Sequence, residues 1–461
     1  MAEAIRRTRL GALRNRPLIG GTLSVAALTA FARLNGGVRE ILVAREFGTS
    51  AALEAFLVGF GLMTLIVTAV GGALPGALIP TFFRTGEPNV DRASDLMSEM
   101  LPRLGLWLVG GAVVVIVGAG AITSIIGGGF DQATADQLRE VLIVLAPVIP
   151  ISGMASLCTS LVNARERFLI GAVPQVFNPI TTVVVIVSVS EPRSTTLALA
   201  FLAGFGAELL ASAAIAAGTG VRLRFRMMLD GVRRTPGTSS TLEDRRMFFA
   251  MFLPMFVAFA VQASSLVIDQ AVASHLPQGQ VAVLAFGSRI TGFITAVGIT
   301  AIGTVVLPQF SRLSLSGKGA ELEQSVRAKL VIVGVTGAVI ALGLSLASEP
   351  ILNAVFGRGR FTTADVVAAA QVQVVAAWQI PIHFINVLYL RLLSAGRRQR
   401  MILAVSLVGA LINLVLDIIL ARWIGVRGIV LSTTGVLMFV CLAYRHLARI
   451  DISHLKRGAG A

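Results

Sequence analysis

Three arginines lie where the surrounding sequence is almost wholly apolar. Arg33 and Arg39 fall in an apolar stretch over residues 17–43, and Arg289 falls in another over residues 280–308. A charged side chain at the centre of a membrane-spanning helix costs at least about 2.5–3.5 kcal/mol, so such residues usually face a cavity or a partner. Guanidinium groups form paired hydrogen bonds with phosphate oxygens. The three arginines therefore predict a binding site for a diphosphate group.

A structural role is the competing interpretation for one of these arginines. Arg39 could pair with Glu40, with Glu46 or with a lipid phosphate. Arg33 and Arg289 lie too deep in their spans to reach the interface by snorkelling, which favours a binding role for both.

Three acidic residues are candidates for a gate or for ion coupling, namely Glu40, Glu54 and Asp269. Glu54 and Asp269 fall near the predicted outer face of the membrane. There they could meet Arg39 or Arg45 and close an outer gate, or they could be solvated surface groups.

The sequence lacks the residue patterns that enzymatic chemistry and metal binding need. The two cysteines, Cys158 and Cys441, lie far apart in apolar runs, which rules out a cysteine cluster. The sequence contains no phosphate-binding loop of the Walker type and no loop with paired carboxylates. We expect no cofactor and no catalytic site, and we expect a transporter.

The composition indicates which elements must position the charged residues. The 461 residues are 55% hydrophobic and only 14% charged, and the mean hydropathy is +0.83. A water-soluble globule is excluded, and the chain is expected to be an all-α polytopic membrane protein. Twelve stretches are long and apolar enough to span a membrane: 17–43, 51–80, 104–127, 140–162, 168–189, 195–219, 247–275, 280–308, 328–348, 366–395, 402–421 and 426–446.

The distribution of basic residues predicts the orientation. Of 39 Lys and Arg residues, 28 fall on the side that includes both termini, and seven fall in the loops of the other side. Basic residues accumulate on the cytoplasmic side, so both termini are expected in the cytoplasm of a bacterial inner membrane. The net charge of +15 is then explained by topology and by attraction to anionic membrane lipids, and it gives no reason to expect nucleic acid.

An internal repeat divides the chain into two halves. A shift of 228 residues places residues 79–84 on residues 307–312, and it also matches residues 30–32 to residues 258–260. Two parallel six-helix lobes around a central cavity are therefore predicted. The expected boundaries are an N-terminal lobe over 1–221, a basic cytoplasmic linker over 222–246, a C-terminal lobe over 247–446 and a cytoplasmic tail over 447–461.

Several segments resemble the MurJ/MviN family of lipid II flippases, which belongs to a superfamily with polysaccharide flippases and multidrug antiporters. Residues 31–48, from the first span, are similar to the family's opening motif. Further similarities follow in chain order at residues 54–56, 163–179, Arg289 and residues 356–362. The resemblance implies export of a polyprenyl-diphosphate-linked saccharide by alternating access, with Arg33, Arg39 and Arg289 holding the diphosphate. It implies that a membrane potential or an ion gradient drives transport. Enzymes of cell-wall or polysaccharide synthesis are further expected partners.

Departures from the family pattern keep other functions open. The family's basic residues in the second span are absent here, and Gly292 replaces an acidic residue. Lipid II is the first expected substrate, and another lipid-linked polysaccharide unit is the second.

A cation-coupled multidrug antiporter would need a buried carboxylate. Asp417 is instead expected to form an interfacial pair with Arg422, so the deep charges are predicted to be basic. A scaffold that recruits enzymes through residues 222–246 is a third hypothesis.

Overall fold

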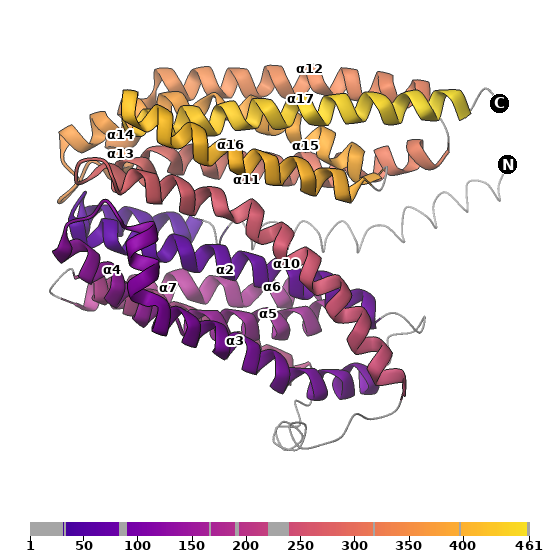
Figure 1. Ribbon diagram of the computed structural model, residues 1–461, viewed down its shortest axis with the longest axis horizontal. Coiled ribbons are helices and arrows are strands. Elements are labelled where there is room, and N and C mark those ends of the chain that lie inside the picture. The colour runs from indigo at the N-terminus through magenta and orange to yellow at the C-terminus, as the bar shows by residue number, and fades with distance from the viewer. Residues whose placement is uncertain are drawn as a thin grey trace, which may run out of the picture. The chain divides into compact units, whose positions relative to one another are not determined.

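A computed structural model describes most of the chain, namely residues 31, 34–82, 90–165, 167–189, 193–219, 239–316, 319–395 and 398–458. Within these ranges every regular element is a helix, as expected for an all-α membrane protein (Figure 1). The central cavity between two lobes remains a prediction.

The helices of the first half are α2 (Ala51–Phe82), α3 (Val90–Ile126), α4 (Gln132–Leu145), α5 (Val148–Ala164), α6 (Phe168–Ala172), the 3-10 helix η1 (Val173–Val176), α7 (Phe177–Ser188) and α8 (Ser194–Gly218). The helices of the second half are α10 (Ser239–Ala273), α11 (Gln280–Leu315), α12 (Gly319–Leu346), α13 (Ser348–Phe356), α14 (Thr363–Ala377), α15 (Gln379–Ala395), α16 (Gln399–Ile424) and α17 (Val426–Gly458). Residues 34–47, before α2, are also helical.

Eleven helical segments in the described part of the chain are long and apolar enough to cross a membrane. Each overlaps one of the twelve predicted spans. The remaining predicted span, the first in the chain at residues 17–43, lies mostly outside the described residues. The helices often begin before the apolar run: α12 starts at Gly319, although its apolar stretch starts near residue 328. A helix continues through a polar turn because its backbone hydrogen bonds do not depend on an apolar side chain.

The helix boundaries repeat between the two halves. The starts of α2, α3, α4, α6 and α8 are followed 229 to 232 residues later by those of α11, α12, α14, α16 and α17. A break recurs as well: α4 ends before Ala146, and α14 ends before Trp378. The proline after each break, Pro147 or Pro381, lacks the N–H that an unbroken helix uses. The helix pattern therefore repeats at a shift one to four residues longer than the 228-residue period of the sequence.

The chain divides into two compact units. Unit 1 comprises Met1–Val43, Leu62–Ile122 and Asp136–Ala260, and unit 2 comprises Ala44–Gly61, Thr123–Ala135 and Val261–Ala461. In unit 1, α8 packs against both α5 and α7. The buried side chains of Cys158, Val162 and Ala216 form a small core between α5 and α8.

Unit 2 has a larger core. Buried side chains of α11, α12, α15 and α17 meet in one cluster, which includes Val306, Phe310, Leu322, Leu388 and Tyr444. A second cluster joins α12, α14 and α15 around Ala341, Ala377 and Phe384. Both free cysteines, Cys158 and Cys441, lie among apolar side chains of different units.

Candidate functional site

Arg39 is held by three neighbours inside unit 1. Its guanidinium carbon lies 4.4 Å from the centre of the Phe201 ring on α8. One terminal nitrogen lies 3.3 Å from the Glu40 carboxylate, and the other donates to the side-chain oxygen of Asn178 at 3.4 Å. Only 16% of the Arg39 side chain is exposed. Of the pairings considered for Arg39, the structure shows the one with Glu40, and it is one of several contacts that fix the direction of the guanidinium.

Asn178 connects Arg39 to an acidic residue that sequence reasoning missed. The amide nitrogen of Asn178 donates to Glu208 at 3.2 Å, while its oxygen accepts from Arg39. Glu208 lies in the middle of the apolar helix α8. The rule that singled out the deep arginines would have found it as well. The expectation that the deep charges are all basic is therefore wrong.

A glycine brings α7 and α8 together at this position. A Cβ atom at Gly204 would lie 2.5 Å from the Thr182 hydroxyl oxygen and 2.7 Å from the Asn178 carbonyl oxygen. Because the contact includes backbone, a larger side chain would force the two helices apart. Gly204 thus allows Asn178 and Glu208 to come within hydrogen-bonding distance.

The other two predicted arginines differ in what the structure describes. Arg289 lies on α11, nine residues after its start at Gln280, which corresponds to about 14 Å along the helix axis. Its side chain is exposed within unit 2, as a group that meets a ligand or water must be. Arg33 lies outside the described residues.

Two carboxyl groups meet in the interior of unit 2. The Asn413 amide nitrogen on α16 lies 2.9 Å from a carboxylate oxygen of Asp417 and 3.3 Å from one of Asp269. Asp417 is fully buried. Two anionic carboxylates this close repel each other, and a proton or a bound cation removes the repulsion.

Hydroxyl and amide oxygens complete the surroundings of this carboxylate pair. The Thr433 hydroxyl donates to Asp269 at 3.5 Å, and the Ser432 hydroxyl lies 3.4 Å from the Asn413 amide nitrogen. One oxygen of Asp417 is buried without a hydrogen-bond partner among the described residues. Carboxylate, amide and hydroxyl oxygens suit a hard cation. The predicted interfacial pair of Asp417 with Arg422 is wrong, because a buried carboxyl one helical turn from Asn413 takes the amide as its partner.

Glu54 occupies the beginning of a helix in unit 2. Its carboxylate is buried, with 2% of the residue exposed, and accepts a hydrogen bond from the backbone N–H of Val281 at 2.7 Å. This N–H belongs to the first turn of α11, where backbone donors lack helical partners and the helix dipole favours an anion. The expected arginine partner is not Arg45, which pairs with Glu46 at 3.5 Å.

Further contacts join the segment around Glu54 to residues 360–365 of unit 2. The backbone N–H of Arg360 donates to the backbone carbonyl of Arg45 at 2.8 Å, and the Thr49 hydroxyl donates to Asp365 at 3.0 Å. Gly48 has a φ of 58° and lies against the Arg360 backbone, where a Cβ atom would approach the carbonyl oxygen to 2.5 Å. Residues 44–61 are therefore tied to unit 2 by backbone as well as side-chain hydrogen bonds.

The described residues contain no group of three or more His, Cys, Asp or Glu side chains that could hold a metal ion. Asp269 and Asp417 therefore offer a cation two carboxyl groups, with Asn413 and Thr433 beside them.

A family model described as "Lipid II flippase MurJ" matches residues 43–460. The chain belongs to the MurJ family. Its members are transporters and not enzymes, and the chain is a multi-pass membrane protein of this family.

Individual MurJ relatives align with most of this chain. A probable lipid II flippase MurJ from Thermotoga maritima is 26% identical over 416 residues, which cover 90% of this chain and 82% of the relative. One from Vibrio cholerae is 22% identical over 464 residues, covering 96% of this chain and 85% of the relative.

Solved structures share the fold. A lipid II flippase MurJ in an inward closed conformation superposes with a TM-score of 0.76 at 19% identity, covering 94% of this chain and 89% of that one. An inward-facing multidrug transporter of the MATE family gives 0.75 at 14% identity, with coverages of 92% and 96%. At these identities the two structures show a common fold for MurJ and MATE proteins and do not distinguish their substrates.

Proposed function

We propose that this protein translocates lipid II, a polyprenyl-diphosphate-linked saccharide, from the cytoplasmic to the outer leaflet of the bacterial inner membrane. The match of the MurJ family model to residues 43–460 carries the proposal. The orientation with both termini in the cytoplasm rests on the distribution of basic residues. Alternating access would present the same binding residues to either side of the membrane.

The proposed substrate contacts are Arg33, Arg39 and Arg289. Arg39 supports this role by its geometry, since Phe201 and Asn178 hold its planar guanidinium in a fixed direction. A preorganised guanidinium loses less conformational entropy when it forms a bidentate pair with phosphate. Diphosphate oxygens would replace Glu40 or Asn178 as acceptors, so binding would exchange one hydrogen bond for another at the terminal nitrogens of Arg39.

The proposed ion-coupling residues are Asp269, which the sequence indicated, and Asp417, which the structure adds. A monovalent cation or a proton bound between the carboxyl groups would draw α10 and α16 together through Asn413. Release of the ion would restore the repulsion and loosen this contact. An ion gradient could in this way bias a conformational equilibrium inside one unit. Glu54 is the proposed gate residue, and Glu40 is proposed to exchange with substrate at Arg39.

The alternative is a cation-coupled multidrug antiporter, and the buried carboxyl group of Asp417 and the half-buried ones of Asp269 and Glu208 favour it. The two functions make opposite demands on the arginines. A flippase for an anionic lipid needs Arg39 and Arg289, whereas export of a cationic drug would be hindered by them.

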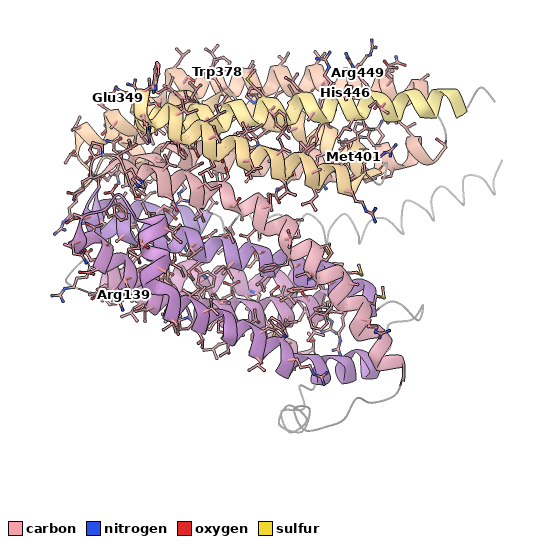
Figure 2. All side chains as sticks on the ribbon, in the orientation of Figure 1. Arg139, Glu349, Trp378, Met401, His446 and Arg449 are labelled. Carbon is pink, nitrogen blue, oxygen red and sulfur yellow. The ribbon has the colours of Figure 1, made fainter. Side chains whose placement is uncertain are left out.

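Complementation of a MurJ-depleted cell, scored by the accessibility of lipid II at the outer face, tests the proposal. We expect the wild-type chain to restore lipid II export, and Arg39→Ala and Arg289→Ala to abolish it at equal protein level in the membrane. Arg139→Ala is the matched control, because this arginine on α4 is exposed (Figure 2) and is not among the proposed contacts. Wild-type export by both test variants would contradict the proposed site. Failure of the wild-type chain, with drug efflux that the same variants do not impair, would favour the antiporter.

A further inference from the structure

A cavity of about 710 Å³ lies between α12, α15 and α17 of unit 2. Its volume is in the range of cavities that bind small organic molecules. Six apolar side chains line it: Val326, Leu330, Ile385, Cys441, Leu442 and Ala448. The polar lining residues are Glu323, Arg327, Tyr389, Arg445 and Arg449. None of these residues takes part in the substrate, ion or gate contacts described above.

The charge of this cavity is positive. Arg327 is paired with Glu323 at 2.5 Å, so these two groups largely cancel. Arg445 and Arg449 lie one helical turn apart on α17, and neither forms an ion pair with another described residue. Figure 2 shows Arg449 near His446 on the last part of α17, beside α12. Two adjacent guanidinium groups without an ion-pair partner among the described side chains favour a phosphate.

The walls of the cavity favour hydrocarbon. The cavity rests on the buried core cluster that includes Val326, Tyr389 and Ala448. Leu442, which lines the cavity, and Val331, the neighbour of the lining residue Leu330, expose 61% and 65% of their surfaces, as expected of side chains that face lipid. A water-soluble anion would leave these apolar walls unused. An acyl chain would cover them and gain the free energy of burial.

We propose that this cavity binds one anionic phospholipid. Its phosphate lies between Arg445 and Arg449, and one acyl chain runs along Leu330, Ile385 and Leu442. The cavity is at the ends of α15 and α17 that the charge distribution predicts to be cytoplasmic, where anionic headgroups and basic residues meet. All of its walls belong to unit 2, so alternation between two lobes would not open or close it. This property fits a resident lipid better than a lipid that must cross the membrane.

Native mass spectrometry of the purified full-length chain tests the proposal. The probes are phosphatidylglycerol and phosphatidylethanolamine with identical acyl chains. We expect one phosphatidylglycerol to bind at about tenfold lower concentration than phosphatidylethanolamine, and Arg445→Gln with Arg449→Gln to remove this preference. The matched control is Arg422→Gln with Arg427→Gln, which removes two exposed arginines from the opposite ends of α16 and α17. Leu330→Trp, which fills the cavity and keeps its charge, should also weaken binding.

Three results would overturn the assignment. Equal binding of both phospholipids by the wild-type chain would show that the charge of the headgroup does not determine binding. An unchanged affinity of the Arg445/Arg449 double variant would place the lipid elsewhere. If the double variant lost affinity for a polyprenyl diphosphate and kept its affinity for phosphatidylglycerol, the cavity would belong to the transported lipid. Inorganic phosphate at equal concentration should not displace phosphatidylglycerol, because it leaves the apolar wall uncovered.

Discussion

The guanidinium of Arg39 stacks on the ring of Phe201, with 4.4 Å between the guanidinium carbon and the ring centre. A cation over an aromatic face gains about 0.5–1 kcal/mol at exposed sites and more when it is desolvated. The two residues come from different parts of unit 1, the helix before α2 and α8. The stacking therefore links the direction of a proposed substrate contact to the packing of its own unit.

Phe201→Leu keeps an apolar side chain at this position and removes the aromatic face. We expect lipid II translocation to slow by about two- to fivefold, because the cation–π energy is lost while the positive charge remains. Arg39→Lys should cost more, since lysine has no planar group for stacking or for bidentate phosphate bonds. Initial rates in proteoliposomes measure both. If Phe201→Leu slowed transport as much as Arg39→Ala, the ring would have a role beyond orienting Arg39.

Glu208→Gln tests whether the hydrogen bonds through Asn178 orient Arg39. Glutamine keeps an oxygen that can accept from the Asn178 amide but removes the negative charge. A purely geometric role predicts nearly unchanged transport for Glu208→Gln and a marked loss for Glu208→Ala. If Glu208 instead carries a proton or a cation, Glu208→Gln should alter the dependence of transport on pH or on a cation gradient. Transport assays at several pH values and in gradients of Na⁺ distinguish these outcomes.

The carboxyl pair of unit 2 predicts a specific coupling defect. Asp417→Asn and Asp269→Asn each remove one of the two charges whose repulsion a cation would relieve. We expect both variants to bind substrate normally and to lose the acceleration of transport by an imposed cation gradient. Glu349→Gln is the control, because this glutamate is exposed at the start of α13. An Asp417→Asn chain that still responded to the gradient like the wild type would remove Asp417 from coupling.

The length of the apolar stretches was enough to predict the spans. A backbone N–H or carbonyl group without a hydrogen bond is costly in hydrocarbon, so an apolar stretch of this length crosses the membrane as a complete helix. Partners of individual charges were harder to predict. Glu54 meets the backbone of Val281, and no side-chain pattern marks a backbone N–H 227 residues away. Asn413 and Asp417 are one turn apart on α16, so their contact was readable from spacing alone. The position of Asp269 beside them follows only from the packing of α10 against α16.

Glu54→Ala should weaken the attachment of residues 44–61 to unit 2. It leaves the first-turn N–H of α11 without its buried acceptor, which costs about 1–3 kcal/mol. If this contact closes the outer gate, the population open to the outside should rise. Cysteine labelling at Thr49 from the outer side measures this population, in a Thr49→Cys chain with and without Glu54→Ala. Glu54→Gln, which keeps an acceptor oxygen, should lie between the two. Equal labelling of all three would show that the helix cap has no part in gating.

Two glycines five residues apart on α11 allow a direct test of packing near Arg289. At Gly287 a Cβ atom would lie 2.7 Å from the Ala369 carbonyl oxygen and 2.7 Å from the Val372 Cβ atom, whereas at Gly292 it would meet nothing within 4 Å. Gly287→Ala should therefore lower thermal stability, because overpacking costs about 1–3 kcal/mol and the α14 backbone cannot yield easily. Gly292→Ala should leave stability unchanged or raise it by up to about 1 kcal/mol, the helix propensity gained over glycine. Melting of the two purified variants in the same detergent measures the difference.

Since Arg289 lies between the glycines, a shift of α11 in Gly287→Ala should also slow transport, and Gly292→Ala should not. Equal melting temperatures would mean that α11 and α14 pack less closely than the contact at Gly287 indicates.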